Sequence, residues 1–207
     1  AENVKFADHW LAPHPGTDAA VAQAMTHVIL QEYYENQPND MFINYAKQYS
    51  DMPFVIMLDE DENGYKAGRF LRASDLGMSG ENNEWKPVIQ DKLSQQLLVP
   101  NGTMGQRWEE GKKWNLKLET EDGTPIDPML SMVESDYHVE TIQFPYFDSS
   151  GDGIFERPIA TRTIQLANGE EVKIATVYDL MTSQYGVQRF EHELEATSYD
   201  DASSKYT

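Results

Sequence analysis

The clearest pattern in the chain is a helical repeat of apolar residues near the N-terminus. Between residues 19 and 33, alanine, methionine, valine, isoleucine and tyrosine recur at intervals of three and four, which is the spacing of one helix face. Thr17 and Asp18 precede the repeat and are residue types that favour helix starts. The pattern predicts a helix of roughly 18 residues that begins there.

A second helix and a preceding strand complete the predicted N-terminal region. Pro38 suits a first helical turn, and apolar positions from Met41 to Tyr49 form one face of a shorter helix that ends before Pro53. Ahead of both helices, Val4 to Leu11 is predicted to form a short strand, which a proline-rich loop at 12–16 ends. The expected order is therefore strand, loop, helix, helix.

From residue 54 onward the pattern favours strands. Two apolar runs, 54–58 and 65–71, flank an acidic turn and predict a hairpin. Residues 113–120 alternate as a strand does, and 161–166 with 171–177 predict a second hairpin because an Asn-Gly pair separates them. The stretches between these runs are rich in turn-forming residues, so we expect ordered loops there.

The last predicted element is a short helix over 176–185, which Gly186 ends, and an acidic, polar tail follows from Glu191. Together the elements predict an α/β fold with helices towards both ends and a β-rich, loop-rich middle.

Composition and charge argue against nucleic acid and the membrane interior as direct partners of the chain. The chain has 207 residues, 40% of them hydrophobic, which is enough for one sizeable core or two small ones. Its 16 basic and 35 acidic residues give a formal charge of −19, which opposes binding to nucleic acid because phosphate contacts need clusters of cations. The acids are spread along the chain, as in halotolerant or ordinarily acidic proteins. No apolar run is long enough to predict direct membrane insertion.

The sequence contains few patterns that would indicate metal-binding or catalytic residues. The absence of cysteine excludes disulfides, thiolate zinc sites and cysteine-ligated iron–sulfur clusters within this sequence. The five histidines lack the spacing of a metal site. Asp148 to Gly153 resembles the start of a calcium loop, but Ile159 stands where a bidentate glutamate is needed. We therefore assign no catalytic residue and no metal ligand.

The helix start at Gly16, Thr17 and Asp18 is the candidate binding site. A glycine removes side-chain bulk, and the free N–H groups of a helix N-terminus attract phosphate. The carboxylate of Asp18 could accept the paired N–H donors on the edge of a guanine ring. The alternative interpretation is a simple helix cap without a ligand.

Several segments resemble a known family. Residues 8–20, with the small-residue helix 22–27 that follows, resemble the cofactor-binding stretch of the dimethyl-sulfoxide-reductase family of molybdenum enzymes. Later segments are similar to the nitrate-reductase large-subunit branch of that family. They are Tyr49 to Pro53, Gly68 to Leu76, Pro100 to Trp108, Phe144 to Phe147 and Val177 to Leu180.

The resemblance implies an enzyme that holds molybdenum between two molybdopterin guanine dinucleotides and reduces nitrate with electrons from quinol in anaerobic respiration. It implies an iron–sulfur beta subunit and a haem-b membrane gamma subunit as partners. The enzyme would associate with the membrane through them, on the cytoplasmic face in bacteria and the outer face in archaea. By the motif match, Gly16, Thr17 and Asp18 would contact the nucleotide end of one cofactor.

The family's metal-ligating aspartate and iron–sulfur ligands lie outside the matched segments, so we expect an internal fragment that is inactive alone. The resemblance assigns 1–53 to a strand-loop-helix part of the cofactor-binding α/β domain. It assigns 54–175 to a β-rich insertion and 176–207 to a short helix and polar tail that return to the body. Two alternatives stay open. One is a related chlorate, perchlorate or selenate reductase subunit, and the other is a stand-alone acidic binding or scaffold module that holds calcium at Asp148.

Overall fold

The computed structural model describes residues 5–62, 64–102, 116–145, 154–187 and 189–190. Its N-terminal part contains both predicted helices. α1 (Asp18–Ile29) continues directly into a π-helical segment, η2 (Leu30–Asn36), and α2 (Asp40–Tyr49) follows. The side chain of Asn39 caps α2 by accepting a hydrogen bond from the N–H of Met41 at 2.8 Å. The helix therefore begins just after the proline that was expected to open it.

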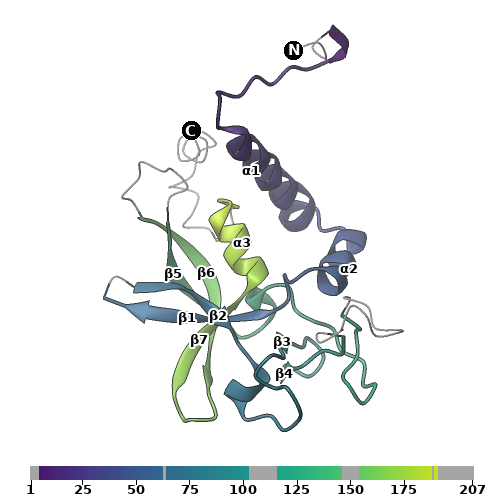
Figure 1. Cartoon of the computed structure of the whole chain (residues 1–207), viewed down its shortest axis with the longest axis vertical. Coiled ribbons are helices and arrows are strands. Elements are labelled where there is room, and N and C mark those ends of the chain that lie inside the picture. The colour runs from purple at the N-terminus through teal and green to yellow at the C-terminus, as the bar shows by residue number, and fades with distance from the viewer. Residues whose placement is uncertain (1–4, 63, 103–115, 146–153, 188, 191–207) are drawn as a thin grey trace.

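The strand predicted over Val4 to Leu11 is wrong in its described part, residues 5–11. Lys5 and Phe6 form a single 3-10 turn, and residues 7–14 have no regular secondary structure. A strand needs a neighbour that pairs with its N–H and C=O groups, and residues 5–16 are exposed along their whole length. Figure 1 shows this stretch extending away from the other elements, beyond the start of α1.

Five strands close into a small barrel. β1 (Val55–Asp61) and β2 (Gly64–Phe70) form the first predicted hairpin, and β6 (Ile154–Gln165) and β7 (Glu171–Thr176) form the second. The sequence pattern does not predict β5 (His138–Pro145), which pairs antiparallel with β6. Around the barrel the order is β1-β2-β5-β6-β7, and β7 returns to β1 in antiparallel register.

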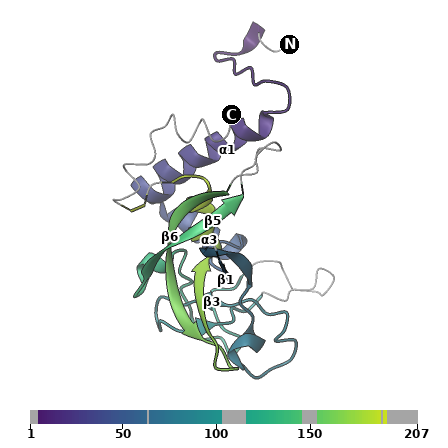
Figure 2. The same cartoon turned by 90° about the vertical axis from the view of Figure 1, so that its left-hand side faces the viewer.

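The barrel closes at a short parallel seam between β2 and β5. Tyr65 lies opposite Ile142 and Lys66 opposite Gln143, whereas the other neighbouring strands of the barrel are antiparallel. Closure matters because an open sheet would leave a row of unpaired backbone groups at each edge. In Figure 2, β5 and β6 cross the molecule beneath α1.

In the described residues, the loops around the barrel contain only short elements. These are two 3-10 turns, η3 (Ala73–Leu76) and η4 (Met132–Glu134), and a small ribbon of β3 (Ile89–Gln90) and β4 (Leu97–Leu98). The strand predicted over 113–120 is wrong in its described part, 116–120, which makes an isolated bridge between Glu119 and Pro125. The N–H of Gly123 donates to the carbonyl oxygen of Thr120 at 2.9 Å, so the chain turns back before a longer ladder can form.

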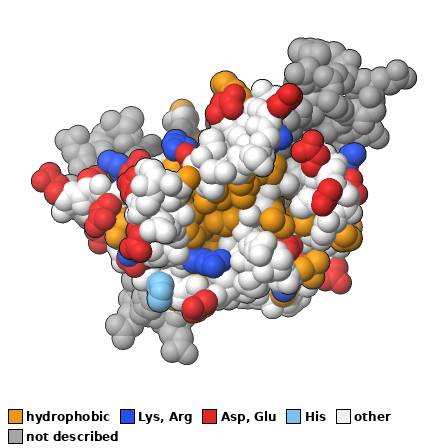
Figure 3. Space-filling view, turned by 90° about the horizontal axis from the view of Figure 1, so that it is seen from below, with side chains coloured by type: hydrophobic (Ala, Val, Ile, Leu, Met, Phe, Trp, Pro, Cys, Tyr) orange, Lys and Arg blue, Asp and Glu red, His pale blue; other side chains and the backbone are white. Residues whose placement is uncertain are grey.

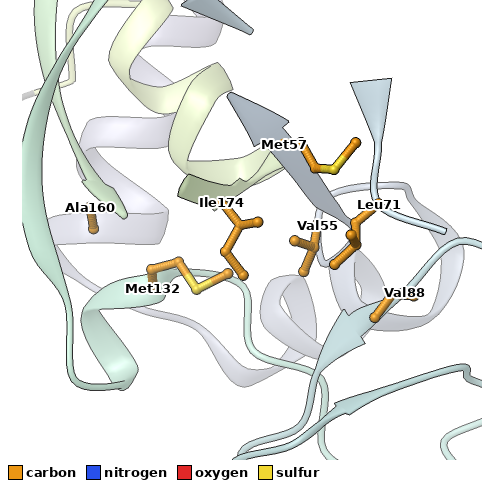
Figure 4. Close-up of a cluster of buried hydrophobic side chains, with 7 residues drawn as sticks. All are labelled: Val55, Met57, Leu71, Val88, Met132, Ala160 and Ile174. Carbon is orange, nitrogen blue, oxygen red and sulfur yellow. The ribbon is translucent and has the colours of Figure 1, made fainter. Parts of the chain in front are cut away.

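Figure 4 shows the main core, a cluster of buried side chains that converge from the barrel strands and from the segments around them. Strands and surrounding loops both contribute to it, and burial of each large aliphatic side chain stabilises the fold by about 1.5–3 kcal/mol. The buried members are Val55, Met57, Leu71, Val88, Met132, Ala160 and Ile174.

The predicted C-terminal helix is confirmed as α3 (Val177–Gln184). The side chain of Thr176 caps its start, and Gly186 follows its end with a φ of 71°. Leu180 packs with β5 and β6 in one buried cluster, whereas Tyr178 packs with η2 and α2 in another. α3 therefore joins the barrel to the N-terminal helices.

The carboxylate of Asp179 in α3 is completely buried and accepts four hydrogen bonds. Oδ1 accepts from Ser131 Oγ at 2.6 Å and from Arg189 Nη1 at 2.5 Å. Oδ2 accepts from the N–H of Met132 and from Thr176 Oγ1, both at 2.8 Å. Burial of a charge is costly unless it is paired and hydrogen-bonded, so these donors keep the carboxylate inside.

Arg189 extends this cluster to the N-terminal helices. Its Nε lies 3.0 Å from the Glu35 carboxylate in η2, and the Tyr178 hydroxyl donates to the same carboxylate at 2.7 Å. Burial lowers the pKa of Arg189, but the negative charges of Asp179 and Glu35 raise it by more than burial lowers it. The guanidinium pKa therefore lies above its usual value. Burial, followed by the Glu35 carboxylate, raises the pKa of Tyr178. Both groups therefore keep their protons at neutral pH.

Asp179→Asn should strongly destabilise the chain. The substitution keeps the side-chain shape but leaves the Arg189 charge buried without its nearest counter-charge, which should lower the free energy of unfolding by about 3–5 kcal/mol. Urea denaturation measures the loss. Asp61→Asn is the control, because its ion pair with Lys66 at 3.0 Å is largely exposed and should contribute less than about 1 kcal/mol. Equal losses in the two variants would show that the buried cluster is not special.

Candidate functional site

Gly16, Thr17 and Asp18 lie in an exposed turn at the N-terminal end of α1. The N–H and Oγ1 of Thr17 both donate to the carbonyl oxygen of His14, at 3.0 and 2.8 Å, which closes the turn. Gly16 has a φ of +89°, and no atom lies within 4 Å of the position that a Cβ would take. The backbone conformation therefore favours glycine here, and the space around it is open to an approaching group.

The start of α1 has donors and an acceptor that could serve a ligand. Among the described residues, no side chain caps this helix, and the first N–H groups of a helix have no partner within it. These N–H groups and the helix dipole attract anions such as phosphate. Asp18 supplies a carboxylate that can accept paired N–H donors. The same carboxylate also stabilises the helix start, so the geometry is compatible with both interpretations.

A cavity of about 1150 Å³ lies elsewhere, between the loop 78–86 that follows η3, the segment 91–102 that includes β4, and the segment 117–126. Sequence reasoning did not predict it, because its lining comes from separate loops without periodicity. Figure 3 shows hydrophobic side chains gathered in a hollow on the face seen from below. Asp91 Oδ2 accepts from Ser94 Oγ at 2.6 Å, and Lys86 lies 3.8 Å from Glu121. These charged groups of the lining already have partners, and the candidate turn does not border the cavity.

The described residues hold no group of three or more histidine, cysteine, aspartate or glutamate side chains that could bind a metal ion. The possible calcium loop at Asp148 lies outside the residues that the structure describes. None of the helices in the described ranges is long and apolar enough to cross a membrane.

One of the family-like segments, 68–76, is explained by the fold. Arg69 donates two hydrogen bonds to the Asp75 carboxylate, at 2.8 and 2.7 Å, and the N–H of Arg72 donates to it at 2.8 Å. A Cβ on Gly68 would come within 2.7 Å of a β1 carbonyl oxygen, beside the register shift of the β1–β2 pair. These residue types hold the turn after β2 in place, and they line no binding site in the described structure.

Curated relatives match almost the whole chain. The nitrate reductase alpha chain of Bacillus subtilis is 46% identical over 202 residues, which cover 97% of this chain and 16% of the relative. The respiratory nitrate reductase 1 alpha chain of Escherichia coli is 40% identical over 97% of this chain and 17% of the relative. The perchlorate reductase subunit alpha of Dechloromonas aromatica is 23% identical over 86% of this chain. No family model matches the chain.

These relatives are all alpha chains or alpha subunits of reductases named for an oxyanion, and this chain is similar to part of each of them. More narrowly, it matches a segment of nitrate reductase alpha chains, which confirms the resemblance seen in its motifs. The chain spans 16–17% of the length of the two nitrate reductase relatives described above.

Asp75→Asn should make the stability of the chain depend less on pH in the acid range. The hydrogen bond from Arg69 is the main influence that holds the pKa of Asp75 below its ordinary value of 3.8. A carboxylate whose pKa is lower in the folded state than in the unfolded state stabilises the fold at every pH above its unfolded-state pKa. This stabilisation is lost as the pH falls through the folded-state pKa. The urea midpoint of the variant should be below wild type at pH 7, and the two should converge below about pH 3.8.

The exposed Asp136 provides the control for this experiment. Asp136→Asn should leave the midpoint close to that of wild type across the same pH range, as surface substitutions usually do. The prediction would be contradicted if the difference between the urea midpoints of Asp75→Asn and wild type stayed constant down to pH 2.

Proposed function

We propose that this chain is a segment of the catalytic alpha subunit of a respiratory nitrate reductase, which reduces nitrate to nitrite with electrons from quinol. The observation that carries the proposal is an identity of 40–46% to two nitrate reductase alpha chains over 97% of the chain. The perchlorate reductase subunit is 23% identical, so nitrate is the favoured oxyanion. The reaction takes up two electrons and two protons and releases water.

The proposed cofactor is molybdenum held by two molybdopterin guanine dinucleotides, with iron–sulfur ligands elsewhere in the subunit. When bound, it supplies the two-electron chemistry of nitrate reduction. An iron–sulfur beta subunit and a haem-b gamma subunit would deliver the electrons. Membrane association would come through these partners, on the cytoplasmic face if the source is bacterial and the outer face if it is archaeal.

Gly16, Thr17 and Asp18 would hold the nucleotide end of one cofactor. Three observations support this role: the turn is exposed, Gly16 leaves open space, and no described side chain caps the start of α1. Backbone N–H groups would donate to the pyrophosphate, and the Asp18 carboxylate would accept from the guanine edge. The chain would thus bind and orient the cofactor without supplying a catalytic group or a metal ligand.

In this proposal residues 1–53 belong to the cofactor-binding domain, 54–175 form an insertion and 176–207 return to the body. The second candidate function is reduction of perchlorate or a related oxyanion, supported by the weaker match to the perchlorate reductase subunit. The two candidates differ in substrate and share the proposed cofactor site.

The proposed function is tested by turnover with both oxyanions. The complete alpha subunit, assembled with its two partner subunits, should reduce nitrate with a higher kcat/KM than perchlorate. The 207-residue chain alone should bind no molybdenum and show no turnover with an artificial electron donor, because it lacks the metal ligand. Preference for perchlorate would favour the second candidate, and turnover by the chain alone would refute the assignment of the catalytic groups to other parts of the subunit.

Asp18→Ala in the complete enzyme should lower its content of guanine dinucleotide. Loss of a charge-assisted pair should weaken retention by about 1.5–3 kcal/mol, whereas loss of a capping role costs only about 1 kcal/mol of helix stability. Guanine nucleotide released by acid hydrolysis, measured per subunit, is the readout.

The matched control is Asp40→Ala, because Asp40 is the first-turn acid of α2 and has no proposed cofactor contact. This variant should keep full guanine dinucleotide content. Full content in Asp18→Ala as well would mean that Asp18 only stabilises the helix start.

A further inference from the structure

Helix α1 carries more apolar surface than the described part of the chain covers. Eight of its twelve residues are alanine, valine, methionine or isoleucine, yet none of the twelve is buried. A helix with apolar residues around most of its circumference is ordinarily enclosed by protein. The exposure of this helix therefore needs an explanation.

The helical ribbon of α1 and η2 has two opposite faces. One holds the buried Leu30 and the partly buried Tyr34 against α2 and α3, and His27 Nδ1 lies 2.7 Å from the carbonyl oxygen of Tyr185. In Figures 1 and 2, α1 lies across one end of the barrel with the strands on one side only. The first face is thus the one that attaches the helix to the rest of the fold.

The second face carries an apolar stripe made of Met25, Val28 and Ile29. These side chains are 54%, 47% and 45% exposed, and their spacing of three and four places them side by side along the helix. α2 has a similar row, since Met41 and Tyr45 are 68% and 61% exposed and stand four residues apart. Large exposed patches of this kind mark interaction surfaces.

We propose that the rest of the same polypeptide packs on this stripe in the complete alpha subunit. The inference rests on the proposed function, because the chain spans 16–17% of its nitrate reductase relatives and most of such a subunit would lie outside the structure. A second copy is a poor occupant, since two chains that each carry a formal charge of −19 repel one another.

The stripe also indicates the chemistry of the surface that covers it. Exposed carboxylates, Asp18 and Glu32, stand near its two ends. The covering surface should therefore be apolar at its centre and carry lysine or arginine at its margins. Because Asp18 begins the same helix, the turn at 16–18 would lie at the border of this interface. The covering segment would then form one wall of the proposed nucleotide site.

Methionine oxidation tests the inference directly. Dilute peroxide is applied to the complete alpha subunit separated from its partner subunits and to this chain alone, and sulfoxide is quantified by peptide mass spectrometry. Met25 should be oxidised about tenfold more slowly in the complete subunit, because oxidation follows exposure. The buried Met132 of the barrel core is the control and should react slowly in both. Equal rates for Met25 in the two samples would overturn the inference.

A substitution provides the second arm. Val28→Asp should leave the denaturation midpoint of the chain alone within the error of wild type but should lower the yield of folded complete subunit several-fold. Leu93→Asp, at a 67% exposed position in the loop between β3 and β4, should lower neither. If Val28→Asp leaves the yield of the complete subunit unchanged, or if the chain alone dimerises in sedimentation with Met25 protected, the inference is wrong.

The two proposals fail differently. Protection of Met25 in a complete subunit that does not reduce nitrate would refute the proposed function and support the interface. Nitrate turnover with Met25 oxidised as fast as in the chain alone would refute the interface and support the function.

Discussion

The buried carboxylate of Asp179 is the constraint on which the arrangement of helices and barrel depends. It belongs to α3, but its donors come from the start of η4, from the end of β7 and from Arg189. Each of these parts must be in place for the charge to remain paired. Through Arg189 and Tyr178, the same cluster holds Glu35 and therefore η2. A charge that would be costly alone becomes the point where the barrel and both helical regions meet.

The elements that could be predicted from the sequence are those with local causes. α1 and α2 follow helical repeats of apolar residues, and Gly186 marks the end of α3. The β6–β7 hairpin follows from an Asn-Gly pair between two alternating runs. The turn at Gly16 was also predictable, because glycine and proline restrict the backbone locally. The ligand of the turn could not be predicted from backbone geometry. The hypothesis that the turn binds the nucleotide end of a cofactor comes from the family resemblance.

The elements that could not be predicted depend on distant partners. Val4 to Leu11 has the composition of a strand, but the described fold gives residues 5–11 no strand neighbour, so they form no strand and stay exposed. β5 was missed because its pairing with β2 and β6 decides its structure. Arg189 lies in a stretch without periodicity, and only the folded structure brings it to Asp179. An aspartate among the apolar positions of a short helix was the one available signal of a buried ion pair.

Closure of the barrel also has a consequence for the order of events during synthesis. β1 pairs with β7 through Val55 to Met57, so these residues must wait for residues 174–176 to leave the ribosome before both of their edges are paired. At about 5–20 residues per second, that wait is on the order of ten seconds. During it, the first hairpin presents unpaired backbone to other nascent chains. The acidic surface of the chain offers some protection in this interval, because like charges keep nascent copies apart before the barrel can close.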